Sequence, residues 1–271
     1  MVAFRLPRSY NLYLREKEKL ESAHKRIPSL LMILAAIPLI FAISSADAVA
    51  ALLNSPNSCS ARTYAAAKKK VLSDAEKGYP LQQFVIGVTT DDEALAKKFL
   101  NASRNKIRTM AESKNNPLSW YLLSMESNDM SMLNKAAKLG NVQALNALGT
   151  IMIRQAFDTS LTPSTNSVEK ALKSAYACFN RAAEQNDPNG FINLGTCYLK
   201  GFGCKQDMAL AFECFRTAAQ AGHPEGMDNL SACYQFGHGA AKDDERSLFW
   251  AMKGRAARGD KAAEKWLQER K

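Results

Sequence analysis

Two Ser-x-x-Lys pairs, Ser103–Lys106 and Ser167–Lys170, are the residues of this chain whose spacing most resembles a catalytic motif. In hydrolases that use this pattern, the serine hydroxyl is the nucleophile and the lysine lies close to it. The pattern is short and common by chance, and the S-D-N and K-T-G elements that accompany it are absent. The two pairs therefore do not define an active site.

The three histidines offer no better candidate for acid–base chemistry. His24 lies in a basic N-terminal segment, and His223 and His238 lie at turns, with His238 between two glycines. No H-E-x-x-H motif and no phosphate-binding glycine loop occur. A zinc site that includes Cys233 and His238 lacks paired C-x-x-C spacing. We therefore predict no catalytic residue, no metal and no cofactor.

The spacing of the cysteines reveals a sequence repeat. Cys178 and Cys214 are separated by 36 residues, and so are Cys197 and Cys233. The same offset relates Pro188 to Pro224, Asn193 to Asn229, Leu194 to Leu230, Tyr198 to Tyr234, Gly201 to Gly237, Gly203 to Gly239 and Asp207 to Asp243. A fixed period of this length indicates stacked supersecondary units.

Expected helix ends extend the register to both sides. Small residues followed by Gly or Asn, which tolerate the left-handed conformation at a helix C-terminus, recur at Gly78, Asn115, Gly140, Asn186, Gly222 and Gly259. The interval from Asn115 to Gly140 is short, and the next interval is long. The turn-forming stretch 158–167 is the expected insertion.

Each regular unit reads as two helices. Asp187–Lys200 has apolar residues at helical spacing, the loop Gly201–Gly203 follows, and Asp207 is placed to cap a second helix over Met208–Ala221. No alternating strand pattern of useful length appears, so we predict an all-α fold. Its units are degenerate over residues 60–135 and regular over 136–271. A helix near Leu267 is expected to cap the stack.

Residues 187–259 resemble Sel1-like repeats, which are relatives of the tetratricopeptide repeat. The matching stretches are 193–198, 201–203, 207–211 and 218–222, with a second copy at 229–234, 237–239, 243 and 256–259. The resemblance implies a right-handed α-solenoid. Two departures stand out: Cys178 and Cys214 replace the usual aromatic of the second helix, and Ser231 replaces a glycine, so looser packing is expected there.

By the same resemblance, the helix that bears the Leu-Gly pair lines a concave, partner-binding face. Counting from that leucine selects Gln143, Asn146, Thr150, Ile153 and Arg154 in one unit, then Asn189, Ile192, Thr196, Leu199 and Lys200, then Glu225, Asp228, Ala232, Gln235 and Phe236. The polar members are expected either to hydrogen-bond an extended protein or peptide ligand or only to solvate the groove.

The N-terminal region is typical of export. A basic leader, residues 1–26, precedes the uncharged run Leu30–Ile43, and Ala46-Asp47-Ala48 resembles a signal-peptidase site. Residues 27–48 are thus either a cleaved signal peptide or, with 27–46 in contact with the membrane, an uncleaved anchor. Both interpretations place the repeats in the periplasm or cell envelope, and the second anchors them in the inner membrane. A buried helix of a cytosolic protein is the third alternative.

Export would permit disulfides, and matched heights on neighbouring helices nominate Cys178 with Cys197 and Cys214 with Cys233, or Cys197 with Cys214. The alternative is free thiols that pack as small apolar residues. The net charge of +10 is compatible with an acidic partner or surface, or with solvated helix faces. The aromatic residues lie at core positions rather than among the basic clusters, which excludes a nucleic-acid-binding pattern.

The sequence therefore favours a non-enzymatic adaptor or scaffold that binds a protein or peptide in a groove within the bacterial cell envelope. Two alternatives remain open. Some cysteine-rich relatives are linked to β-lactams, so the resemblance also allows binding or weak hydrolysis of β-lactams or peptidoglycan. A secreted factor that acts on a host is the other.

Overall fold

The computed structural model describes residues 48–49, 52–53, 61–158 and 164–270. The chain divides into two compact units, Met1–Ser44 and Ser45–Lys271. The first unit, and with it the expected leader and apolar run, lies outside the described residues. Within the residues that are described, no helix is both long enough and apolar enough to span a bilayer.

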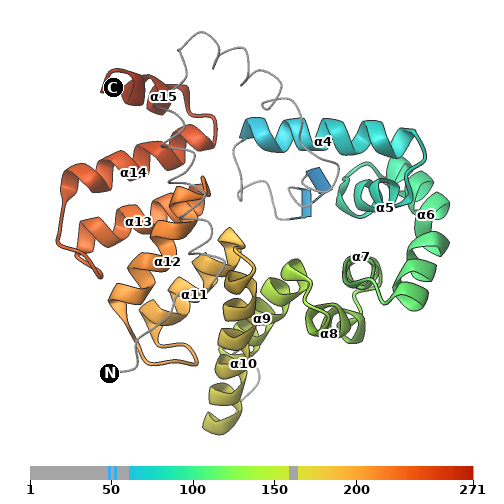
Figure 1. Ribbon diagram of the computed structural model, residues 1–271, viewed down its shortest axis with the longest axis horizontal. Coiled ribbons are helices and arrows are strands. Elements are labelled where there is room, and N and C mark those ends of the chain that lie inside the picture. The colour runs from blue at the N-terminus through green and yellow to red at the C-terminus, as the bar shows by residue number, and fades with distance from the viewer. Residues whose placement is uncertain (1–47, 50–51, 54–60, 159–163, 271) are drawn as a thin grey trace, which may run out of the picture. The chain divides into compact units, whose positions relative to one another are not determined.

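Every regular element in the described part of the chain is an α-helix, which confirms the all-α prediction. The helices follow one another in chain order (Figure 1). They are α4 (Ala61–Glu76), α5 (Pro80–Thr89), α6 (Glu93–Lys114), α7 (Pro117–Ser127), α8 (Met130–Lys138), α9 (Val142–Ala156), α10 (Thr165–Glu184), α11 (Pro188–Lys200), α12 (Met208–Gln220), α13 (Pro224–Phe236), α14 (Asp244–Ala257) and α15 (Lys261–Gln268).

Helix hairpins stacked in series make up the second unit. The closest pairs are α5 with α6, α7 with α8, α9 with α10, α11 with α12 and α13 with α14, and each pair contacts the next through neighbouring helices. This succession confirms the solenoid of helix pairs. The short interval in the sequence corresponds to the compact α7–α8 hairpin.

The expected insertion is shorter than predicted. α10 begins at Thr165, inside the stretch 158–167 that the sequence assigned to a loop, because Ser164 caps the helix by accepting a hydrogen bond from the Ser167 amide at 3.3 Å. The turn-forming residues at the end of the stretch therefore start the helix.

The predicted helix ends are confirmed by the backbone. All six Gly and Asn residues chosen from the sequence adopt positive φ angles, from 49° at Asn115 to 91° at Gly259. Asp207 also caps α12 as expected, accepting hydrogen bonds from the amides of Ala209 and Leu210 at 3.0 Å. Pro188 and Pro224 occupy the first turns of α11 and α13, where no amide donor is needed.

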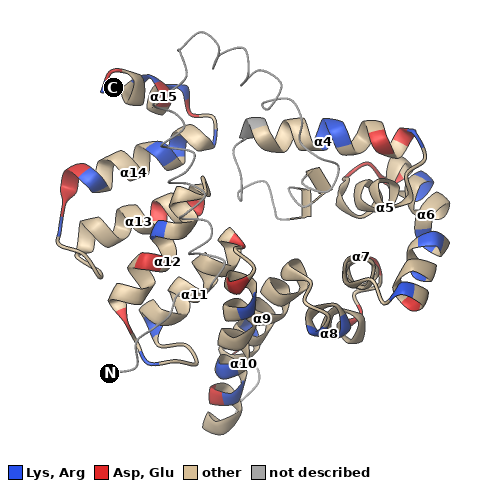
Figure 2. Ribbon diagram, viewed as in Figure 1, with Lys and Arg blue, Asp and Glu red and all other residues tan. Residues whose placement is uncertain are grey.

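Basic residues are distributed over several helices (Figure 2). Lys68 and Lys69 are exposed on α4, and Lys97 and Lys98 are exposed on α6. Their neighbours Ala67 and Phe99 are buried in the same helices. The clusters therefore lie on the outer faces of amphipathic helices, as solvated basic residues usually do.

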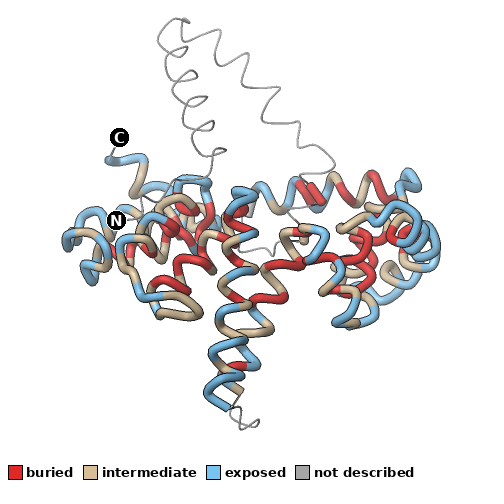
Figure 3. The backbone as a smooth tube through the Cα atoms, turned by 60° about the horizontal axis from the view of Figure 1, so that its bottom comes forward, coloured by how far each residue is buried: buried red, intermediate tan, exposed pale blue. Residues whose placement is uncertain are grey.

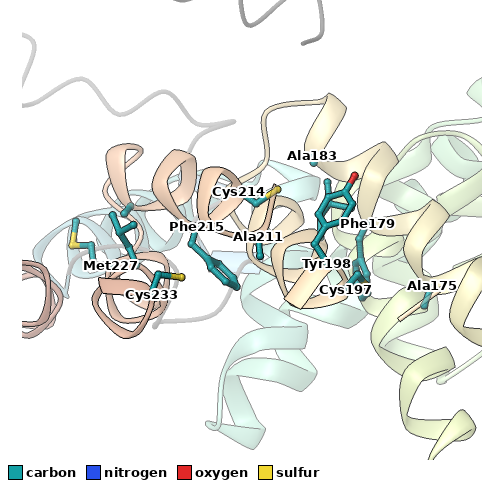
Figure 4. Close-up of a cluster of buried hydrophobic side chains, with 13 residues drawn as sticks. Ala175, Phe179, Ala183, Cys197, Tyr198, Ala211, Cys214, Phe215, Met227 and Cys233 are labelled. Atoms are coloured by element: carbon teal, nitrogen blue, oxygen red, sulfur yellow. The ribbon is translucent and has the colours of Figure 1, made fainter. Parts of the chain in front are cut away.

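Glycine and phenylalanine fit together inside the hairpins. A Cβ atom on Gly195 would lie 2.7 Å from the ring of Phe215, and one on Gly149 would lie 2.6 Å from the ring of Phe179. Both rings are buried in the core cluster drawn in Figure 4. Because glycine has no side chain, α11 approaches α12 closely enough for the ring to cover its backbone.

The hairpin α13–α14 has other residues at the positions of this glycine–phenylalanine contact. Ser231 replaces the glycine, and Ala251 occupies the position that Phe215 holds in the previous repeat. Ser231 is buried and donates a hydrogen bond to the Ser247 carbonyl at 2.8 Å, and we expect the smaller residue at position 251 to leave room for it. The substitution is accommodated by a paired change rather than by a gap.

The loop of each regular repeat packs on the preceding hairpin. Gly203 lies so close to the Leu172 carbonyl that an added Cβ would be 2.3 Å from the oxygen, and Gly239 approaches the Met208 carbonyl in the same way. These contacts cover α10 near Leu172 and the first turn of α12. Figure 3 shows buried and exposed stretches alternating along these helices, as successive packing of hairpins requires.

Candidate protein-binding face

The first helices of successive hairpins lie next to one another. α9 contacts α11, and α11 contacts α13, in addition to the contacts within each hairpin. All the residues predicted to bind a partner lie on these three helices. We call the solvent-facing residues of α9, α11 and α13 the first-helix face.

Asn146 on this face joins two repeats rather than pointing to solvent. Its amide nitrogen donates to the Asp187 carboxylate at 2.7 Å, and its oxygen accepts from the Asn193 amide at 3.1 Å. Asp187 also caps α11 by accepting from the Gly190 amide at 2.7 Å. Burial raises the pKa of Asp187, although these hydrogen bonds act in the opposite direction. The network fixes the position of α11 against α9.

Asn189 and Asp228 have similar structural roles one repeat later. Asn189 accepts a hydrogen bond from the His223 ring at 3.0 Å, which ties α11 to the start of α13. Asp228 forms a two-pronged ion pair with Arg258 at the end of α14. Asn146, Asn189 and Asp228 are thus occupied by contacts within the protein, which the sequence prediction did not include.

His223, which donates to Asn189, is buried. Its side chain is 2 % exposed, and its Nδ1 atom has no hydrogen-bond partner among the described residues. Burial, with the positive charge of Arg258 nearby, lowers the pKa of His223 to about 4. The ring is therefore neutral at physiological pH and donates one hydrogen bond through Nε2.

Acidification should destabilise the protein through His223. The unfolded histidine has a pKa near ~6.5, so this contribution to stability is complete above that pH and is lost as the pH falls toward the folded value of about 4. We expect a loss of up to about 3 kcal/mol over that range. Urea unfolding at several pH values, compared with His223→Asn, measures it.

His223→Asn is a suitable reference because asparagine occupies the equivalent position of α9, where Asn141 caps the helix. The variant keeps every other titrating group, including Asp187, so its pH profile isolates the histidine. Parallel profiles for the two proteins between neutral pH and pH 5 would contradict the assignment.

The other predicted residues differ in exposure. Arg154, Lys200, Glu225 and Gln235 are exposed. Thr196 is half-buried and donates to the Ile192 carbonyl of its own helix at 3.0 Å. Gln143 is half-buried and has a partner within the protein. The side chains available to a ligand are therefore mainly these four: Arg154, Lys200 and Gln235 lie towards the C-terminal ends of α9, α11 and α13, and Glu225 lies in the first turn of α13.

Exposed aromatic rings accompany these residues at the helix ends. Phe157 ends α9 with its side chain 53 % exposed, and its ring lies 5.2 Å from the ring of Phe202 in the loop after α11. Phe236 ends α13 and is 60 % exposed. The sequence prediction included Phe236 but missed the other two, because α9 lies outside the 36-residue register and Phe202 was assigned to the loop only.

The cysteines are thiols in this structure. Cys178, Cys197, Cys204, Cys214 and Cys233 are all free, so none of the bridges proposed between Cys178, Cys197, Cys214 and Cys233 forms among the described residues. Figure 4 shows why matched heights were insufficient: Cys214 and Cys233 lie on different sides of Phe215. Cys178 precedes the buried Phe179 on α10, and adjacent helical positions point about 100° apart.

Burial makes these thiols unreactive. It raises the pKa of Cys197 and of Cys214 to about 12, and that of Cys233 to about 11, so all three are protonated at neutral pH. In this structure these three cysteines pack as small residues in the core. Cys204, which the sequence prediction omitted, lies in the loop with its sulfur 3.5 Å from the Cys197 carbonyl.

The Ser-x-x-Lys pairs do not form a catalytic arrangement. Ser103 is buried and donates to the Phe99 carbonyl within α6 at 2.7 Å, whereas Lys106 is exposed. Ser167 and Lys170 are both exposed in the first turns of α10. In the described part of the chain, no three His, Cys, Asp or Glu side chains are grouped as metal ligands.

Comparisons with known proteins agree with the repeat register. The Sel1 repeat family model matches residues 161–187, 192–223 and 224–253. No curated protein sequence matches the chain.

Among solved structures, a Sel1 repeat protein from Oxalobacter formigenes is 22 % identical. That match covers 47 % of this chain and 90 % of the other, with a TM-score of 0.40. A protective antigen of uropathogenic Escherichia coli strains, described as displaying an SLR fold, is 17 % identical. It matches over 73 % of this chain and 52 % of its own length, with a TM-score of 0.33.

Proposed function

We propose that the protein is a scaffold that binds a protein partner on its first-helix face, because the Sel1 repeat family model matches residues 161–187, 192–223 and 224–253. Sel1 repeat proteins generally mediate protein–protein interactions. The observation that supports this use of the face is a difference between its side chains: Asn146 and Asn189 join adjacent repeats, Asp228 pairs with Arg258 within the α13–α14 hairpin, and Arg154, Lys200 and Gln235 remain exposed.

The exposed side chains favour a partner segment with acidic and apolar residues. Arg154 and Lys200 lie in the last turns of α9 and α11, and each is close in sequence to an aromatic side chain, Phe157 and Phe202 respectively. Phe157 is exposed, whereas Phe202 is half-buried against the core, and arginine is among the residues enriched at positions that dominate binding energy in protein interfaces. A locked helix array also loses little conformational freedom when a ligand binds.

Charge reversal on this face should abolish most of the binding. We expect Arg154→Glu combined with Lys200→Glu to weaken the interaction by roughly tenfold or more, because the reversed charges repel an acidic segment. The starting point is a photo-reactive amino acid placed at Gln235 in the full chain within its native cells. Mass spectrometry of the cross-linked product identifies the partner, whose affinity for each purified variant is then measured.

Two controls separate binding from folding. A photo-reactive residue at Glu213, which is exposed on α12 outside the first-helix face, should capture little of the same partner. Glu112→Lys on α6 changes an exposed charge elsewhere and should leave the affinity unchanged. Equal cross-linking from Gln235 and Glu213 would reject the assignment of the face.

We further propose that the scaffold works in the cell envelope after export. The basic leader, the apolar run Leu30–Ile43 and the Ala46-Asp47-Ala48 sequence support this proposal. Ala48 and Val49 are buried in the folded protein, so cleavage after Ala48 would have to precede folding, as it does during translocation of an unfolded chain. The mass of the native protein distinguishes a processed product from the full chain, and fractionation reports its location; full-length protein in the cytoplasm would refute export.

A further inference from the structure

Among the described residues, none covers the first half of α14 in the way that the loop glycines cover its counterparts in the two preceding repeats. The loop glycines Gly203 and Gly239 of the next repeat cover α10 at Leu172 and α12 at Met208. An aromatic pair continues each contact: Tyr176 with Tyr198 at 5.8 Å, and Phe212 with Tyr234 at 5.4 Å between ring centroids. The register predicts Leu248 as the third member of the series on α14.

No residue of the described chain supplies the aromatic partner of Leu248. The helix that follows α14 is α15, which ends at Gln268 and spans 8 residues, whereas α13 spans 13. It therefore lacks the turn that carries the tyrosine in α11 and α13. Leu248 is 45 % exposed and its neighbour Phe249 is 38 % exposed, whereas Tyr176 and Phe212, which occupy the position of Leu248 in the two preceding repeats, are less exposed.

One stripe of α14 is chemically self-complementary. Glu245, Phe249 and Lys253 follow one another at intervals of four residues, so they lie along one face of the helix. The Lys253 ammonium lies 4.8 Å from the ring centroids of both Phe249 and Trp250. Figure 2 shows acidic residues at the start of α14 and basic residues toward its end.

We propose that this uncovered part of α14 pairs with the same surface of a second copy of the chain. In an antiparallel pair related by a two-fold axis beside Phe249, Glu245 of each copy lies opposite Lys253 of the other. The exposed side chains of Leu248 and Phe249 meet between these two ion pairs. Two-fold symmetry makes both contacts from one surface. This surface is on the second helix of its hairpin and is separate from the proposed partner-binding face.

Charge exchange tests this pairing specifically. Sedimentation of the wild-type full chain over a concentration series should show a monomer–dimer equilibrium. Glu245→Lys and Lys253→Glu should each weaken the homodimer by tenfold or more, because each change places like charges opposite one another twice. The double variant should dimerise again, and an equimolar mixture of the two single variants should form a heterodimer.

Three further results complete the test. Leu248→Asp should prevent dimerisation, Glu112→Lys should leave it unchanged, and circular dichroism should show that all variants are helical. Heterodimer formation in the mixture requires that both single variants are folded. Unfolding therefore cannot explain why each variant fails to dimerise alone and associates in the mixture. A wild-type protein that stays monomeric up to millimolar concentration overturns the proposal. So does a mixture of the single variants that fails to associate.

Discussion

Gly203→Ala should lower the stability of the repeat array by about 3 kcal/mol or more. Two costs combine at this position. The residue has a φ angle of +71°, where a side chain costs about 1–2 kcal/mol. The added Cβ would also lie 2.3 Å from the Leu172 carbonyl oxygen and 2.8 Å from the Lys173 Cα atom, both of which belong to the backbone of α10. Because neither atom can move without shifting the helix, the loop would separate from the preceding hairpin.

Gly201→Ala is the matched control for this prediction. It has nearly the same φ angle, +73°, but the nearest atoms to its added Cβ are 3.6 Å away. We expect a loss of only about 1 kcal/mol there. Urea unfolding followed by circular dichroism compares the two variants, and equal losses would show that the close approach of Gly203 does not contribute to stability.

Phe215→Ala should destabilise the protein by about 3–5 kcal/mol, because it removes a fully buried ring from the core and leaves a cavity. Gly195→Ser should cost about 1–3 kcal/mol through overpacking against the same ring. The double variant reproduces the combination found naturally at Ser231 and Ala251 in the next repeat. Its loss should therefore be smaller than the sum of the two single losses.

A double-mutant cycle measures that coupling, which we expect to be about 1–3 kcal/mol in the favourable direction. Ser231→Gly serves as the reference, because it removes the hydrogen bond to Ser247, and with the cost of a glycine inside helix α13 it should lower stability by about 1–2 kcal/mol. If the losses of stability in the cycle are strictly additive, positions 195 and 215 are not coupled, and the pairing of Ser231 with Ala251 in the next repeat is not a compensating change.

Features that depend on the period could be predicted from the sequence. Helix ends at Asn115 and Gly222, the cap at Asp207 and the core position of Leu194 follow from local chemistry repeated at a fixed offset. Such features are nearly independent of what surrounds each repeat. The start of α10 was harder, since Ser164 is both a turn former and a helix cap.

The role of each polar residue on the first-helix face could not be predicted. Asn146 and Lys200 were selected by the same rule, which counts positions from the leucine of each unit. Asn146 nevertheless donates a hydrogen bond to Asp187, whereas Lys200 is exposed. The difference depends on which side chain of the next repeat comes within reach. Likewise, the heights of Cys214 and Cys233 were estimated from the sequence, but the direction of each side chain around its helix also decides whether two sulfurs meet.

The N-cap residue at the α11–α13 junction is His223, whereas the equivalent residue at the α9–α11 junction is Asp187. The two junctions should therefore differ in stability in mild acid. The α9–α11 junction depends on Asp187, whose pKa is raised, so protons bind it more readily in the folded state. The α11–α13 junction depends on His223, which must stay unprotonated to remain buried. As the pH drops, we expect the α13–α14 hairpin to separate from α11 and unfold first. Unfolding should then proceed from the C-terminal end of the array rather than in all repeats at once.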